Sequence, residues 1–162
     1  MTTLTLDIPT DEPVIRFERF VAAPPELVFR AMTEAEHLPH WWGPRGTRMR
    51  ACEIDLRVGG SYRFVLAAGQ DEAAFHGTYR EIDPPRRVVQ TLVYEGAPDH
   101  EAVETMTLEA VPGGTLLRGE TRHASLGARD DHVASGMEGG MRETYERLDE
   151  LLATLRTLSP AT

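Results

Sequence analysis

The sequence lacks most of what an exported or membrane-spanning protein needs. Cys52 is its only cysteine, so no disulfide can form within the chain, and a reducing cytoplasm suits it. Nowhere do 18 apolar residues stand together, and residues 1–10 show no basic segment followed by an apolar run. We therefore expect a cytoplasmic protein with no signal peptide and no membrane span.

Positive charge is also scarce. The formal net charge is -9, and the short basic groups around Arg48 and Arg86 are interrupted. Binding to a phosphate backbone needs clustered basic residues, so nucleic acid is not an expected partner. With 162 residues, 41% of them apolar, the chain has enough material for one domain with a substantial core.

Motifs for metal, phosphate or nucleophilic chemistry are missing. His37 and His40 are three residues apart with Pro39 between them, and no set of four ligands is complete, so we interpret them as solvated. Cys52 and the serines have no catalytic motif around them. Gly59-Gly60 joins two strands and does not open a helix, so it forms no phosphate loop. No metal and no cofactor are expected.

The first third of the chain predicts a strand followed by two short helices. Residues 1–12 read either as a loose leader or as a short edge strand, and the alternation over residues 14–22 predicts a strand with one buried face. Pro25 favours the first turn of a helix. Thr33 with Glu36 three residues later has the capping-box spacing, which predicts a second short helix ending before Gly43-Pro44.

The middle of the chain has the period of strands, separated by turns rich in glycine and proline. Six consecutive strands with such short connections must pair antiparallel, because parallel pairs need long crossovers. The predicted strands span residues 47–56, 60–67, 73–82, 87–94, 102–111 and 114–123.

A helical period returns after Gly127. Its apolar stripe predicts one helix of about 25 residues, capped by Asp130 or Asp131. With a rise of about 1.5 Å per residue, such a helix is long enough to cross the sheet. It should be the main cover of the sheet's apolar face. We place one domain at residues 13–156 and a frayed tail at residues 157–162.

The motifs that fill this order resemble a known family. They are Ala23-Pro24-Pro25-Glu26-Leu27-Val28-Phe29, Trp41-Trp42-Gly43-Pro44, Asp55-Leu56-Arg57-Val58-Gly59-Gly60, His76-Gly77-Thr78-Tyr79, Pro84-Pro85-Arg86-Arg87-Val88-Val89, Gly114-Thr115 and Gly136-Met137. The chain resembles the START-like (SRPBCC, helix-grip) superfamily, and within it bacterial relatives of the C-terminal domain of the activator of heat-shock protein 90 ATPase. The resemblance implies an α+β helix-grip fold, a seven-stranded curved antiparallel sheet closed over the long C-terminal helix around a cavity.

Glycines support a hollow interior. Gly136, Gly139 and Gly140 fall in the first half of the predicted helix, where each costs about 1 kcal/mol relative to alanine. They remove side-chain volume, as Gly119 does in the last strand. Tight packing of helix on sheet is the alternative explanation, and the resemblance favours a cavity under the first half of the helix.

Alternation along the strands predicts which side chains line that cavity. Aromatic bodies with polar tips suit a pocket that is apolar but orients a ligand, although ordinary core packing is the alternative for each residue. The predicted ligand-binding residues are Trp42, Tyr62, Phe64, Phe75, Tyr79, Gln90, Tyr94, Met106, Thr121, His123, Met137 and Met141.

Three functions remain open at this point. The first is binding of a small hydrophobic or aromatic molecule, a lipid included. The second is a protein-interaction module, a co-chaperone-like contact with a heat-shock protein 90 type ATPase in the stress response, as the resemblance implies. The third is a cyclase- or hydrolase-like enzyme on a polyketide-like or aromatic substrate, with Glu104 and His123 as acid and base. We favour binding over catalysis, and a homodimer through an edge strand or the Trp42 region is possible.

Overall fold

The computed structural model describes residues 3–158 and consists of one antiparallel sheet covered by helices. The strands are β1 (Thr5–Asp7), β2 (Val14–Val21), β3 (Arg48–Ile54), β4 (Ser61–Ala68), β5 (Asp71–Asp83), β6 (Arg87–Tyr94), β7 (Glu101–Val111) and β8 (Gly114–Arg122). Their order across the sheet is β1-β2-β8-β7-β6-β5-β4-β3. The predicted antiparallel meander and helix-grip architecture are confirmed, with eight strands where seven were predicted.

The additional strand comes from the N-terminal segment. Thr5, Leu6 and Asp7 pair with Glu18, Phe17 and Arg16 of β2, so residues 5–7 form an edge strand and not a loose leader. At the other end of the chain, Thr157 and Leu158 belong to the last helix. Residues 159–162 of the predicted tail lie outside the described residues.

The short helices differ in part from prediction. Helix α1 (Pro25–Thr33) begins at Pro25 as predicted, but the second element is only a 3-10 turn, η1 (Leu38–His40). The predicted capping box is wrong, because Thr33 is the last residue of α1. Its hydroxyl donates to the carbonyl oxygen of Phe29, four residues earlier, at 2.7 Å. A threonine that bonds back into its own helix cannot cap the next one.

The predicted C-terminal helix is two helices. Ser125, not Asp130 or Asp131, caps α2 (Leu126–Ala134), accepting a hydrogen bond from the Ala128 N–H at 3.1 Å. Gly136 then has φ +87°, a left-handed conformation that favours glycine, and separates α2 from α3 (Met137–Leu158). Within residues 3–158, no helix is long and apolar enough to cross a membrane.

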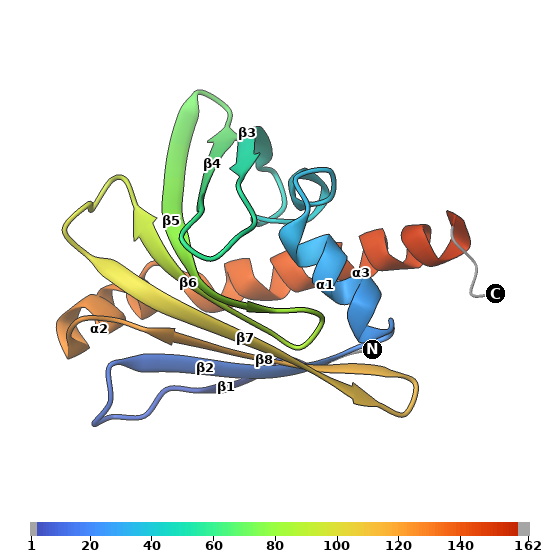
Figure 1. Cartoon of the computed structure of the whole chain (residues 1–162). Coiled ribbons are helices and arrows are strands. Elements are labelled where there is room, and N and C mark those ends of the chain that lie inside the picture. The colour runs from blue at the N-terminus through green and yellow to red at the C-terminus, as the bar shows by residue number, and fades with distance from the viewer. Residues whose placement is uncertain (1–2, 159–162) are drawn as a thin grey trace.

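Helix α3 lies across the curved sheet, with α2 at its beginning and α1 against its second half (Figure 1). The second half of α3 belongs to the main hydrophobic core. Leu148 and Leu152 are buried there with Val28 of α1 and Leu117 of β8. The fold is therefore solid under the second half of α3.

A buried ion pair fixes α3 against the sheet. Arg19 of β2 has a side chain only 4% exposed, and its guanidinium donates two hydrogen bonds to Asp149 of α3, at 2.8 and 2.6 Å. A two-pronged contact of this kind sets orientation as well as distance. It joins elements 130 residues apart in sequence and fixes how α3 is rotated over the sheet.

We expect loss of this pair to destabilise the fold. Replacing Asp149→Asn leaves the Arg19 charge buried with no counter-charge. The free energy of unfolding should fall by about 2 kcal/mol, below the full cost of a broken buried pair because Asp149 is partly exposed. Urea denaturation measures this change. Glu146→Gln, at an exposed acid of the same helix, should change stability by less than about 0.5 kcal/mol; equal losses in the two variants would contradict the role of the pair.

Candidate functional site

A cavity of about 290 Å³ lies between the sheet and the first half of α3. Helix α3 contributes Met137, Gly140, Met141, Thr144 and Tyr145 to its wall. The strands contribute Phe17, Phe64, Leu66, Phe75, Tyr79, Val88, Gln90, Leu92, Glu104, Met106, Leu108, Glu120 and Thr121. The segment from α1 to β3 and helix α2 complete it with Phe29, Met32, Thr33, Leu38, Trp41, Trp42, Gly43, Pro44 and His132.

Aromatic rings form much of the wall. Trp42 packs edge-on against Phe64 and Phe75, with ring centroids 5.0 and 5.2 Å away. Its neighbour Trp41 is buried, and the indole N–H donates to the carbonyl oxygen of Ala31 in α1 at 2.8 Å. Trp41 thus anchors the segment, while Trp42 presents its ring to the cavity.

One row of polar residues crosses this apolar wall. The sheet register pairs Tyr79 of β5 with Gln90 of β6, Gln90 with Glu104 of β7, and Glu104 with Thr121 of β8. Paired residues on neighbouring antiparallel strands project to the same face, so all four side chains reach the cavity side by side. We call Tyr79, Gln90, Glu104 and Thr121 the polar row.

Glu104 is the ionisable centre of the polar row. The Gln90 side-chain amide donates to Glu104 Oε1 at 3.2 Å, and within residues 3–158 this is the only hydrogen bond to the carboxylate. Burial raises the pKa of Glu104 to about 7, while the Gln90 hydrogen bond lowers it by a smaller amount. At neutral pH the group is therefore divided between its neutral and charged forms, and it can donate or accept a hydrogen bond.

The structure places most of the predicted ligand-binding residues in the cavity wall. Two tyrosines lie elsewhere. Tyr62 is buried, and its hydroxyl donates to the carbonyl oxygen of Thr91 at 2.6 Å. Tyr94 is 46% exposed and packs on Phe75, its partner in the sheet register, with ring centroids 5.4 Å apart, but it does not line the cavity. The residues that do line the cavity are Trp42, Phe64, Phe75, Tyr79, Gln90, Met106, Thr121, Met137 and Met141.

His123 also lies outside the cavity wall and meets another histidine instead. Its Nε2 is 3.0 Å from Nδ1 of His132 in α2, and it is His132 that lines the cavity. Burial, followed by the neighbouring His132, lowers the pKa of His123 to about 4, and burial lowers the pKa of His132 as well. Both rings are therefore neutral at pH 7, and the predicted acid and base, Glu104 and His123, are not brought together.

The glycines serve different purposes. Gly140 lines the cavity, and an added Cβ there would meet only Pro44, at 4.0 Å. Gly139 lies outside the cavity wall with nothing near its Cβ position, and Gly136 ends the preceding turn. Gly119 does not create space: the Phe17 ring occupies the volume above it, 2.1 Å from an ideal Cβ. Only Gly140 opens the cavity as predicted.

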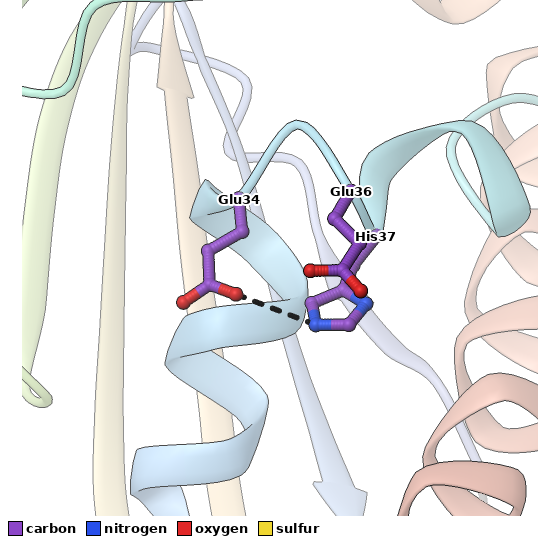
Figure 2. A group of neighbouring side chains, drawn as sticks. All are labelled: Glu34, Glu36 and His37. Atoms are coloured by element: carbon purple, nitrogen blue, oxygen red, sulfur yellow. Dashed lines mark ion pairs between the residues drawn. The ribbon is translucent and has the colours of Figure 1, made fainter.

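One group of side chains has the composition of a metal site. Figure 2 shows His37 beside the carboxylates of Glu34 and Glu36, with ligand atoms all within 4.8 Å of one another. His37 is buried, contrary to the solvated interpretation, and its Nε2 lies 3.4 Å from Glu34 Oε1 without a hydrogen bond. Arg30 already donates to Glu34 Oε2 at 3.1 Å, so a cation in this group would compete with a guanidinium.

The lone cysteine fits no catalytic role. Cys52 on β3 is partly buried, and burial raises the pKa of its thiol to about 11. The thiol therefore stays protonated at neutral pH and is a poor nucleophile.

Comparison with known families finds one match. Residues 22–153 match the family described as activator of Hsp90 ATPase homolog 1-like protein. No curated protein matches the chain significantly.

Solved bacterial structures share the fold. A protein from Rhodobacter sphaeroides is 30% identical with a TM-score of 0.87, covering 94% of this chain and 99% of that one. A protein from Nitrosomonas europaea is 27% identical with a TM-score of 0.83, covering 93% and 99%. The AHSA1 protein from Silicibacter pomeroyi is 25% identical with a TM-score of 0.70, covering 87% and 98%. The match therefore extends over nearly the whole chain.

The raised pKa of Glu104 makes a prediction about stability. A carboxyl that ionises at about 7 in the folded state and near 4.5 when unfolded binds its proton more tightly in the folded state. Stability from this group is therefore present below about pH 4.5 and is lost as pH rises through 7. Glu104→Gln removes that loss. The free energy of unfolding of the variant should match that of wild type at about pH 4.5 and exceed it by about 2–3 kcal/mol at about pH 8.

Urea denaturation across this pH range measures the difference. Glu109→Gln, at an exposed acid of the same strand, should show no such gain with pH. A stability difference between Glu104→Gln and wild type that is independent of pH would contradict the raised pKa.

Proposed function

Because the chain belongs to the family of activator of Hsp90 ATPase homolog 1-like proteins, we propose that it acts by binding a small apolar or aromatic molecule in the cavity under the first half of α3. The observation that carries the proposal is the cavity itself, with its aromatic wall crossed by one polar row. Family membership fits a ligand-binding or activator-like domain and names no ligand.

Size and lining support this function. The cavity volume, about 290 Å³, is close to the lower end of small-molecule sites, which span about 300–1,000 Å³. Such sites are mostly apolar with a few convergent polar groups, and the polar row supplies those groups here. Each Å² of apolar ligand surface moved out of water contributes about 25 cal/mol, so contact with the rings would supply most of the affinity.

The space under the first half of α3 also has to be accounted for. Cavities left by missing side chains destabilise a fold, because the surrounding atoms lose packing contacts. Gly140 and Thr144 are small residues on the very face of α3 that covers the cavity, whereas Leu148 and Leu152 fill the equivalent positions further along. We take the difference between the two halves of the helix as support for a space kept for a ligand.

The alternatives have less support. The co-chaperone function rests on the family name. Catalysis by the predicted acid and base needs both groups to face one substrate, and Glu104 lines the cavity whereas His123 does not. The cavity therefore favours binding.

Two neighbouring glycines of α3 allow a matched test. Gly140→Leu places a side chain in the cavity, whereas Gly139→Leu places the same side chain outside its wall, and both gain helix propensity. We expect the neutral dye N-phenyl-1-naphthylamine to bind the wild type and Gly139→Leu alike. Its affinity for Gly140→Leu should be weaker by about tenfold or more, equivalent to about 1.4 kcal/mol.

Fluorescence titration measures these affinities, and thermal unfolding confirms that each variant folds. If the dye does not bind the wild type, or binds both glycine variants equally well, ligand binding in this cavity is wrong.

A further inference from the structure

The charges around the cavity point to one class of ligand. We infer that the preferred ligand is a small apolar organic cation, a protonated amine on an aromatic or aliphatic body, whose nitrogen binds the Glu104 carboxylate. This inference rests on the proposed function and adds the chemical class of the ligand.

The Glu104 carboxylate has an unused oxygen. Gln90 donates to Oε1, and within residues 3–158 no group donates to Oε2. Glu104 lines the cavity, and protein atoms do not fully enclose its Oε2. This oxygen is therefore open to the cavity. A half-satisfied carboxylate in an apolar cavity needs a donor, and a charged donor contributes more than a neutral one.

Within residues 3–158, no arginine pairs with Glu104. All 17 basic side chains of the sequence are arginines, and none of them lines the cavity. Both arginines of β2 already have partners: Arg16 binds Glu120 at 2.9 Å, and Arg19 binds Asp149. A buried carboxylate is normally paired with a positive charge, and here that charge has to come from the ligand.

No other group facing Glu104 can take this role. Tyr62 of β4 and Tyr145 of α3 face it, and burial raises the pKa of each phenol, so both stay neutral. Burial raises the pKa of Tyr79 of β5 in the same way and lowers that of His132 of α2. Glu120 of β8, the other carboxylate in the wall, is already paired with Arg16 and with Arg122 at 3.6 Å.

The aromatic wall suits the same ligand. A cation near the face of an aromatic ring is attracted by the ring's electron density, and sites for organic ammonium groups are often lined by several rings. Trp42, Phe64, Phe75 and Tyr79 all line the cavity that Glu104 enters. These rings also offer a surface to the apolar body of the ligand. An organic anion would be repelled by the Glu104 carboxylate, and no arginine among residues 3–158 lines the cavity to offset that repulsion.

Three molecules with one body and different heads test the inference: 2-phenylethylamine, 2-phenylethanol and phenylacetate. By calorimetry at about pH 8.5, where Glu104 is ionised, the amine should bind at least about tenfold more tightly than the alcohol. Phenylacetate should have the weakest affinity of the three. Near about pH 5.5 the preference for the amine should fall to within about threefold, because Glu104 is then protonated. Repeating the amine titration near about pH 6 in buffers of different ionisation enthalpy should show release of a proton, which the alcohol does not cause.

Glu104→Gln is the decisive variant. It keeps a side chain that can accept from Gln90, and it should lose both the preference for the amine over the alcohol and the pH dependence of that preference. Glu109→Gln should keep both. Retained binding of N-phenyl-1-naphthylamine shows that each variant folds with its cavity intact.

The outcomes separate this inference from the proposed function. If the dye binds but the amine is no better than the alcohol, or if binding strengthens as pH falls, the ligand is not a cation and only the inference is overturned. The second of these results would indicate a neutral ligand accepting a hydrogen bond from protonated Glu104. If neither dye nor panel binds, both the inference and the proposed function are wrong.

Discussion

The long helix α3 lies across a concave sheet, and the difference in bulk between its two halves determines what the interior becomes. Leu148 and Leu152 fill the space under the second half of α3 and meet Val28 and Leu117 in a solid core. Under the first half, Gly140 and Thr144 leave the space open. The Arg19–Asp149 pair holds the helix in one rotation, so the small residues face the sheet and the cavity keeps its position. Stability and the site therefore depend on the same helix but on different turns of it.

The register of the sheet determines the chemistry of that open space. Because Tyr79, Gln90, Glu104 and Thr121 are paired in turn across four strands, they form one continuous polar row in a wall that is largely apolar. A shift of one residue between β6 and β7 would turn Glu104 to the outer face. The same register leaves Glu104 with Gln90 as its only partner among the described residues. A carboxyl in this position is costly to ionise in the empty protein, and that cost is what a positively charged ligand would relieve.

Much of this architecture could be predicted from the sequence because period and turn residues are local signals. Both boundaries of each of the six strands from β3 to β8 lie within two residues of prediction, and alternation placed Phe64, Phe75, Tyr79, Gln90 and Met106 on the cavity side. Local signals failed where long-range packing decides the outcome. Tyr62 has the alternation of a lining residue, yet it is buried outside the cavity wall. The neighbouring Gly77 has no side chain and leaves room for the Tyr62 ring, and the carbonyl oxygen of Thr91 accepts a hydrogen bond from the Tyr62 hydroxyl.

The helical part of the wall was the hardest to predict. Phe29 and Met32 of α1 and His132 of α2 line the cavity, and which turn of a helix meets a given strand is not encoded in its period. The amphipathic pattern of α1 could have indicated that Phe29 faces inward, but not which space it faces. The break at Gly136 was missed because a glycine inside a helical pattern can be either tolerated or terminal, and only its φ of +87° decides.

Methionine methyl groups offer the most direct test of a ligand cavity under the first half of α3. Four of the six methionines, Met32, Met106, Met137 and Met141, line the cavity, and Met49 lies on β3 outside its wall. In protein labelled with ¹³C at the methionine methyl groups, adding 2-phenylethylamine should shift the NMR signals of the four lining methyls and leave Met49 unchanged. Shifts at Met49 alone, or no shift at a concentration that saturates binding, would place the ligand elsewhere and contradict the account.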